Sequence, residues 1–251
     1  MSSRLLFHDA VQCFATLEST NSYAIDLVKS QNVREGTIIW AIEQTAGRGQ
    51  QTTKWQSAAN MSLTFSQILY PTFLEVQKIA FLNMCIALAI QDAVSDFTEE
   101  KIWIKWPNDI YVKGKKLGGI LIENGVHGNH LSYAVIGVGL NVNQWEFPAE
   151  LPLAISLLQV NGETLECSQL LAQIQQRIAH YYGLLEDKKY TTIKLLYLHH
   201  LLGFHEAVYI ESSVFNGKVK VMDITDDGRV VVVSEEEEKF VYGIKEVRWK
   251  I

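Results

Sequence analysis

Cysteine is scarce in this 251-residue sequence, which contains only Cys13, Cys85 and Cys167. The three lie far apart, and the sequence has no Cys-x-x-Cys pair and no histidine at metal-ligand spacing. A disulfide framework and a structural metal site are therefore not expected. Unpaired cysteines of this kind fit a reducing compartment, so the sequence predicts a cytoplasmic protein.

Positive charge is also in short supply, with 22 Lys and Arg against 28 Asp and Glu and a formal net charge of −6. This balance gives no general attraction to phosphate backbones or anionic lipids, which argues against DNA or a membrane as a partner. Long apolar runs are missing as well. The longest, residues 79–94, is interrupted by Asn83, Gln91 and Asp92 and is typical of a buried helix. The N-terminus lacks an apolar run long enough for a signal peptide.

The remaining composition, 48% hydrophobic and 20% charged, is that of a globular protein with room for one large and one small domain. Ser19 and Thr20 precede an apolar pattern typical of a capped helix that runs to about Lys29. Strands are expected at 36–43, 61–68, 102–106, 117–123 and 131–138, and further helices at 74–94 and 168–202. The sequence therefore predicts an α+β fold, a mixed β-sheet with flanking helices.

After Gly203 the pattern changes to short strands separated by turn signals, at 207–211, 218–222, 229–233 and 240–242. Such spacing predicts a small C-terminal β-barrel, in which the glutamates at 235–238 form a solvated hairpin tip. We therefore divide the chain into a domain of residues 1–203 and a barrel of residues 204–251. Because no low-complexity linker separates the two, we expect them to share an interface.

A polar loop at residues 45–54 places Arg48 between Gly47 and Gly49. Glycines let a backbone wrap closely around a ligand, and a guanidinium between them offers a fork of donors to phosphate or carboxylate. A surface turn would select the same triplet. The segment has no apolar anchor, so we expect it to be mobile until a ligand binds and to close over that ligand.

The segment Lys105-Trp106-Pro107-Asn108-Asp109 follows the strand expected at 102–106. Pro107 has no N–H to donate to a sheet, so the chain should leave the sheet here and present Asn108 and Asp109 at its edge. Asp109 could hold a magnesium ion or accept a proton, or it could simply form a turn.

A second cluster begins with a turn at residues 113–115 and continues into an apolar strand headed by Lys116. Gly118 and Gly119 are unfavourable inside a strand unless something approaches the backbone closely. A bound ligand or a β-bulge would each explain them.

Two glycines and two asparagines end the strand expected at 131–138: Gly137, Gly139, Asn141 and Asn143. The glycines again permit close approach, and an asparagine amide supplies paired donors and acceptors. The spacing fits neither the dinucleotide fingerprint nor the phosphate-binding P-loop, which disfavours those nucleotide-binding folds.

Taken together and in order, five motifs resemble those of the biotin–protein ligases. They are Glu18-Ser19-Thr20-Asn21, Gln44-Thr45-Ala46-Gly47-Arg48-Gly49, Lys105-Trp106-Pro107-Asn108-Asp109, Lys116-Leu117-Gly118-Gly119-Ile120 and Gly137-Val138-Gly139-Leu140-Asn141. The resemblance covers roughly residues 15–145, while the C-terminal part is similar in its helix-then-barrel pattern. The resemblance implies the short form of the family, because only about fifteen residues precede the motif that contains Ser19, and we expect no winged DNA-binding domain in so short a stretch.

The resemblance implies a catalytic domain related to lipoate ligases and class II tRNA synthetases, followed by a small barrel. It also implies an enzyme that uses ATP and Mg²⁺ to convert biotin into biotinyl-5′-adenylate. The biotinyl group would then pass to a lysine of a biotin carboxyl carrier domain of a carboxylase. Fixed cations such as Lys116 and Arg48 would oppose the negative charge that gathers at the α-phosphate.

The resemblance further implies a role for each matching residue. Catalytic roles fall to Lys116, Arg48 and Asp109, with Mg²⁺ bound near Asp109. Biotin would contact Ser19, Thr20, Asn21, Gln44, Gly47, Arg48, Gly49, Lys116 and Gly119. The nucleotide would contact Arg48, Gln50, Trp55, Asn108, Asp109, Lys116 and Asn141.

The sequence departs from the family pattern in its loop, and it leaves other functions open. Relatives commonly place a second arginine two residues after the first, then Gly and Arg, where this chain has Gln50, Thr52 and Thr53.

A lipoate or octanoate ligase would share the fold and the catalytic lysine. A biotin-responsive repressor is opposed by the acidic charge and the missing helix-turn-helix. Exposed strand edges would allow a sheet-mediated homodimer, and the C-terminal residues 248–251 match no known role.

Overall fold

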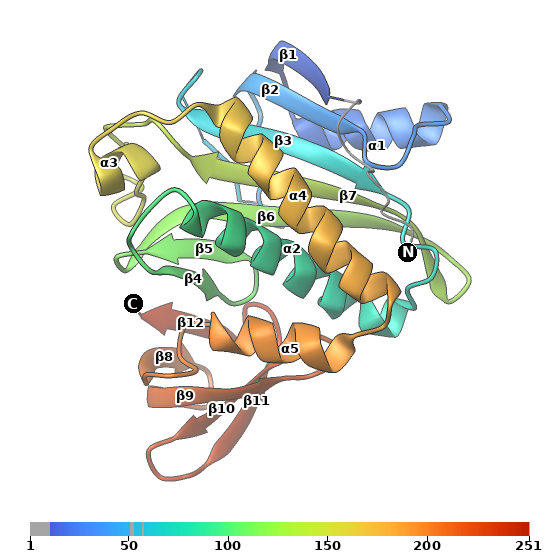
Figure 1. Cartoon of the computed structure of the whole chain (residues 1–251). Helices are drawn as coiled ribbons and strands as arrows, with labels where there is room; N and C mark the ends of the chain where they lie inside the picture. The colour runs from blue at the N-terminus through green and yellow to red at the C-terminus, as the bar shows by residue number, and fades with distance from the viewer. Residues whose placement is uncertain (1–10, 51–52, 57, 251) are drawn as a thin grey trace.

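A seven-stranded mixed sheet forms the centre of the molecule (Figure 1). The computed structural model describes residues 11–50, 53–56 and 58–250. The strand order is β1-β2-β3-β7-β6-β5-β4; β1 and β2 pair in parallel and all other neighbours pair antiparallel. The strands are β1 (Val11–Leu17), β2 (Ile38–Gln44), β3 (Ser62–Leu69), β4 (Ile102–Lys105), β5 (Asp109–Val112), β6 (Lys115–His127) and β7 (His130–Asn141).

Two helices cover one face of this sheet and a third covers the other (Figure 1). The bounds are α1 (Thr20–Ser30), α2 (Ile79–Ser95) after a short 3₁₀ turn η1 (Val76–Lys78), α3 (Leu157–Asn161), α4 (Cys167–Glu186) and α5 (Tyr190–His199). Helix α2 is apolar on nearly every side and packs between the sheet, α4 and α5. Helix α1 packs on the opposite face against β2, β3 and β7.

The stretch Val76–Ser95 is long and apolar enough to cross a membrane, but 67% of it is buried inside the fold. Twelve residues of α2 are buried, among them Phe81, Leu82 and Ile86. The stretch is thus the core helix that the sequence predicted.

The C-terminal unit is a five-stranded antiparallel sheet in the order β11-β10-β9-β8-β12 (Figure 1). Its strands are β8 (Val208–Ser212), β9 (Asn216–Ile224), β10 (Val230–Ser234), β11 (Lys239–Tyr242) and β12 (Val247–Lys250). Buried residues of this unit, including Val221, Val230 and Trp249, belong to the same core cluster as α2. The interface expected between the two units is therefore present.

Polar contacts tie the two units together beside the seven-stranded sheet. The Trp106 Nε1 donates to the Gly228 carbonyl oxygen at 3.0 Å, and Trp106 is 3% exposed. Lys78 and Lys194 form ion pairs with Asp226. Residues 200–202 run parallel to β4 and bond its backbone at Ile104, so this edge of the sheet is covered.

Several boundaries differ from those expected from the sequence. The helical block predicted at 168–202 is two helices, because the chain turns between them at Lys188, whose φ is +54°. Strands β1, β5 and β12 were not expected, since each is short or exposed and shows little hydrophobic periodicity. The turn at 113–115 is confirmed: Lys113 and Gly114 have positive φ and join β5 to β6.

Trp106→Phe tests the contact between the units. The variant loses the part-buried hydrogen bond to the Gly228 carbonyl, so we expect the free energy of unfolding to fall by about 0.5–1.5 kcal/mol. Urea denaturation measures this, with Trp145→Phe as the control because Trp145 is 62% exposed. Equal stability losses in the two variants would contradict the assigned role of Trp106.

Candidate active site

A cavity of about 710 Å³ opens on the side of the sheet that faces α1. It brings together the start of α1, the loop after β2, the β4–β5 turn, β6, β7 and the chain around β12. Of the residues to which the resemblance assigns a catalytic or ligand-binding role, those lining it are Ser19, Thr20, Asn21, Gln44, Arg48, Gly49, Gln50, Trp55, Asn108, Asp109, Lys116 and Gly119. Motif residues as far apart in the sequence as Ser19 and Gly139 thus meet at one site.

Gly47 and Asn141 do not line the cavity. A Cβ at Gly47 would lie 2.6 Å from the Trp55 carbonyl oxygen, so this glycine allows the two arms of the loop to approach each other. Asn141 is 4% exposed and its Nδ2 donates to the Ile155 carbonyl oxygen at 3.1 Å. Both residues therefore support the walls of the site from behind.

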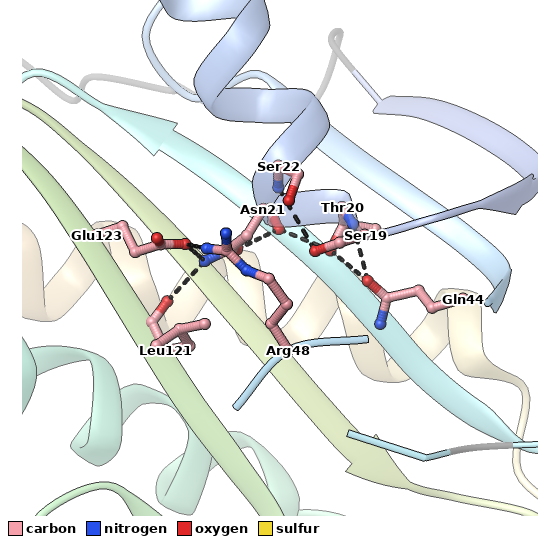
Figure 2. Close-up of polar contacts among 9 residues, drawn as sticks. Ser19, Thr20, Asn21, Ser22, Gln44, Arg48, Leu121 and Glu123 are labelled. Atoms are coloured by element: carbon pink, nitrogen blue, oxygen red, sulfur yellow. Dashed lines mark hydrogen bonds and ion pairs between the residues drawn. The ribbon is translucent and has the colours of Figure 1, made fainter. Parts of the chain in front are cut away.

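One end of the cavity is polar and is built on the first turn of α1 (Figure 2). Ser19 is the N-cap, and its side chain accepts from the backbone N–H of Ser22. The Thr20 N–H and hydroxyl both donate to Gln44 Oε1, at 2.8 and 3.2 Å. Because its oxygen is engaged twice, Gln44 has its Nε2 hydrogens left to offer.

Asn21 lies beside this pair and is held on every side. Its Nδ2 donates to the Leu121 carbonyl oxygen at 3.2 Å and to Glu123 at 2.8 Å, while its Oδ1 accepts from Ser66 at 2.6 Å. A Cβ at Gly137 would come within 2.2 Å of Oδ1. The glycine on β7 is thus the space into which the Asn21 amide fits, which is the close approach that the sequence predicted at this position.

Arg48 reaches across the cavity from its loop to Glu123 on β6 (Figure 2). The described part of the loop is a narrow hairpin: Gly49 N–H donates to the Thr53 carbonyl and Trp55 N–H to the Gly47 carbonyl, at 2.8 and 3.0 Å. Residues 51–52 lie outside the described residues, and the expected closure of this loop over a ligand stays a prediction.

Trp55 lies against β7 next to the polar end. A Cβ at Gly139 would come within 2.5 Å of the Trp55 ring, so only glycine allows the indole to lie on the strand here. Trp55 Nε1 is buried and has no hydrogen-bond partner among the described residues. Trp55 lines the cavity together with Asp109 and Lys116.

Lys116 and Asp109 form an ion pair between neighbouring strands, with Nζ and Oδ1 2.6 Å apart. The β5–β6 register shifts by one residue between Ile110 and Tyr111, so a bulge accompanies the glycines at 118 and 119. Gly118 packs under Leu140, where a Cβ would come within 2.4 Å of that side chain. The bulge and the close approach therefore account for Gly118, whereas a Cβ at Gly119 would meet nothing nearer than 3.4 Å and Gly119 lines the cavity.

Lys105, opposite Asp109 in the β4–β5 hairpin, adds a cation that the site predictions did not include. Its Nζ donates to the Tyr111 hydroxyl at 3.1 Å. Burial lowers the pKa of Lys105, the charge of Asp109 opposes this, and Lys116 adds to the lowering. Burial and the charge of Asp109 raise the pKa of Tyr111 to about 12, so this phenol stays protonated.

Two further cations come from the C-terminal unit, since Lys245 and Arg248 also line the cavity. No sequence motif identified them, because they precede or lie in a short strand that had no recognised pattern. The cavity thus contains Arg48, Lys54, Lys105, Lys116, Lys245 and Arg248 against a single carboxylate, Asp109. This excess of positive charge suits a ligand that carries phosphates.

No group of three His, Cys, Asp or Glu side chains within the described ranges could hold a metal ion. A nucleotide-bound Mg²⁺ does not need such a group, because it keeps several waters and takes one or two carboxylates plus phosphate oxygens. Asp109, 20% exposed at its side chain, is the carboxylate at hand. The site therefore fits Mg²⁺ that arrives with a nucleotide.

Comparison with known proteins identifies the family. Residues 13–141 match the model of the biotin/lipoate A/B protein ligase family. The chain belongs to this family. It is 32% identical over 247 residues to the bifunctional ligase/repressor BirA of Bacillus subtilis, an alignment that covers 96% of this chain and 73% of that protein.

Two further similar proteins are both biotin–protein ligases by name. A biotin–[acetyl-CoA-carboxylase] ligase of Mycobacterium tuberculosis is 32% identical over 171 residues, covering 65% of this chain and 62% of that one. The solved structure of an Aquifex aeolicus biotin protein ligase in complex with biotin and ATP has a TM-score of 0.80 and 26% identity, covering 97% of this chain and 99% of that one. The family fold thus includes the C-terminal unit.

Proposed function

We propose that this protein is an ATP-dependent biotin–protein ligase. It converts biotin to biotinyl-5′-adenylate and transfers the biotinyl group to a lysine of a biotin carboxyl carrier domain. The observation that carries this choice within the family is the polar end of the cavity, where Gln44 Nε2 and the Ser19 hydroxyl are available as donors and Asn21 Oδ1 as an acceptor. A cyclic urea has one carbonyl to accept and two N–H groups to donate, whereas the dithiolane ring of lipoate has no N–H.

In the first step an oxygen of the biotin carboxylate attacks the α-phosphorus of ATP, and pyrophosphate leaves. Negative charge builds up on the phosphate oxygens, and the cations of Lys116 and Arg48 stabilise it. Lys116 is held in place by its ion pair with Asp109, and Arg48 by Glu123. Mg²⁺ supplies further charge neutralisation on the phosphates when it is bound with the nucleotide.

In the second step the neutral amine of the acceptor lysine attacks the carbonyl of the mixed anhydride. An amide bond forms, AMP leaves with the electrons of the anhydride bond, and the amine loses a proton. The loop of residues 45–54 would cover the anhydride between the two steps and keep water away.

We assign the binding of biotin and ATP to residues 1–203. Lys245 and Arg248 of residues 204–251 line the same cavity, which supports a contribution of the C-terminal unit to that site. Three free cysteines support a reducing compartment, the cytoplasm. The net charge of −6 supports a protein acceptor rather than DNA. The outer edge of β1 would serve a sheet-mediated homodimer, since its residues are mostly exposed.

Incubation with labelled biotin, ATP and Mg²⁺ tests the proposal, followed by chromatography for the adenylate and by addition of an apo carrier domain. We expect the adenylate to form with biotin and not with lipoate, and the label to pass to the carrier. Turnover of lipoate alone would favour the lipoate-ligase alternative. Biotin-dependent retardation of DNA fragments would favour a repressor.

Lys116→Ala should fold normally but form the adenylate at least about 100-fold more slowly, because the side chain is partly exposed and its charge acts on the transition state. Lys115→Ala is the matched control, since the neighbouring lysine is exposed and does not line the cavity. Adenylation at the wild-type rate in Lys116→Ala would remove this lysine from the mechanism.

Gln50→Arg should slow the escape of biotinyl-adenylate, because a guanidinium at this cavity-lining position adds a charge-assisted hydrogen bond of roughly 1.5–3 kcal/mol. The measurement is the dissociation rate of the adenylate in single-turnover conditions without acceptor. If the variant releases it as fast as the wild type, other cations at the cavity, such as Arg248, already compensate for Gln50.

A further inference from the structure

We infer that Ser66 is a positioning residue for biotin: its hydroxyl couples the Asn21 oxygen, which can accept from the ligand, to the Thr20–Gln44 pair, which can donate to it. Ser66 belongs to none of the sequence motifs, and it does not line the cavity. It lies directly behind two residues that do, Thr20 and Asn21. This inference rests on the proposed function, since the ligand considered is biotin.

Ser66 is fully buried on a strand that is paired on both sides. It lies on β3 between β2 and β7, opposite Ile39 on one side and Gly137 on the other, and its exposed fraction is 0%. Its Oγ lies 2.6 Å from Asn21 Oδ1 and 2.7 Å from Thr20 Oγ1. Only Thr20 Oγ1 of these two oxygens carries a proton, so the proton positions of Ser66 and Thr20 depend on each other in this buried site.

The orientation of the Asn21 amide is fixed by its surroundings. Nδ2 faces the Leu121 carbonyl and the Glu123 carboxylate, and both of these can only accept. Oδ1 therefore points to Ser66, into the space that Gly137 leaves. If the amide turned over, Oδ1 would face the Leu121 carbonyl and the Glu123 carboxylate, neither of which has a proton to donate.

The hydroxyls of Ser66 and Thr20 form a chain with two arrangements, because Ser66 has one proton for two acceptors. In the first, Ser66 donates to Asn21 and Thr20 donates back to Ser66. In the second, Ser66 donates to Thr20 and Thr20 donates to Gln44 Oε1, which holds the Gln44 Nε2 toward the cavity. The second leaves Asn21 Oδ1 without its donor.

A ligand N–H that reaches Asn21 Oδ1 replaces the Ser66 proton there and favours the second arrangement. That arrangement strengthens the hold on Gln44, whose Nε2 donates to the carbonyl of the same urea. Ser66 thus couples the acceptor and the donor of the urea site. A ring without N–H groups leaves the first arrangement in place, in which Gln44 Oε1 accepts from the Thr20 N–H alone, so the arrangement favours the urea over such a ring.

Ser66→Ala tests this coupling, with Ser62→Ala as the matched control. Ser62 lies on the same strand, is 4% exposed, and its Oγ has no hydrogen-bond partner among the described residues. Calorimetry gives the Kd for biotin, desthiobiotin and lipoate, and steady-state adenylation gives kcat and the KM for ATP. Removal of the Ser66 hydroxyl leaves buried groups without a donor and lowers the stability of the variant. All measurements are therefore made at a temperature well below the Tm of each variant.

For Ser66→Ala we expect the Kd of biotin and of desthiobiotin, which keeps the urea, to rise roughly tenfold. The kcat at saturating biotin and the KM for ATP should stay within about twofold, and Ser62→Ala should match the wild type throughout. A loss of packing alone would weaken the binding of both biotin and ATP. A rise in the KM for ATP equal to the rise in the Kd for biotin would therefore overturn the inference. An unchanged Kd for biotin in Ser66→Ala would overturn it as well. Failure of the wild type itself to bind biotin would instead refute the proposed function.

Discussion

The burial of one sheet face under α2 and α4 is the constraint on which the rest of the structure depends. Leu63, Phe65 and Leu69 of β3 belong to the same buried cluster as α2. Strand residues alternate between faces, so Ser62, Thr64 and Ser66 point to the other side. Because the hydrophobic face supplies the stability, the opposite face of the same strand is free to be polar, and the cavity forms there.

Close approach of backbones gives the site its shape. Glycines at 137 and 139 on β7 leave room for the Asn21 amide and for the Trp55 ring. Gly118 lets β6 lie against Leu140 of the neighbouring strand. Glycine weakens a strand. The two glycines of β7, Gly137 and Gly139, are tolerated because β7 is paired with β3 on one side and with β6 on the other.

Charge is distributed unevenly over the molecule. The chain as a whole carries −6, yet the cavity is lined by six Lys and Arg side chains and one aspartate. Such a local excess of cations suits a small molecule that carries phosphates. Arg48 is held by Glu123, and Lys116 by Asp109, so both cations are already oriented toward the cavity rather than spread into solvent.

The sequence by itself determined the α+β class, the buried helix, the C-terminal change to short strands and most of the cavity lining. Periodicity and turn residues are local signals, and the five motifs are short enough to be recognised without a structure. Ser19, Thr20, Gln44 and Lys116 were identified in this way, and each does line the cavity.

Tertiary structure decided the rest, because the missing information is not local. In the sequence, Ser66 and Glu123 look like ordinary strand residues, 45 and 102 positions away from Asn21. The folded sheet brings both into hydrogen-bond contact with Asn21. Lys245 and Arg248 join the site only through the contact between the two units. Conversely, Asn141 lies within a motif, yet its amide turns away to the Ile155 carbonyl. A spacing rule shows which residues are near in sequence, whereas the pairing of distant strands decides which side chains meet.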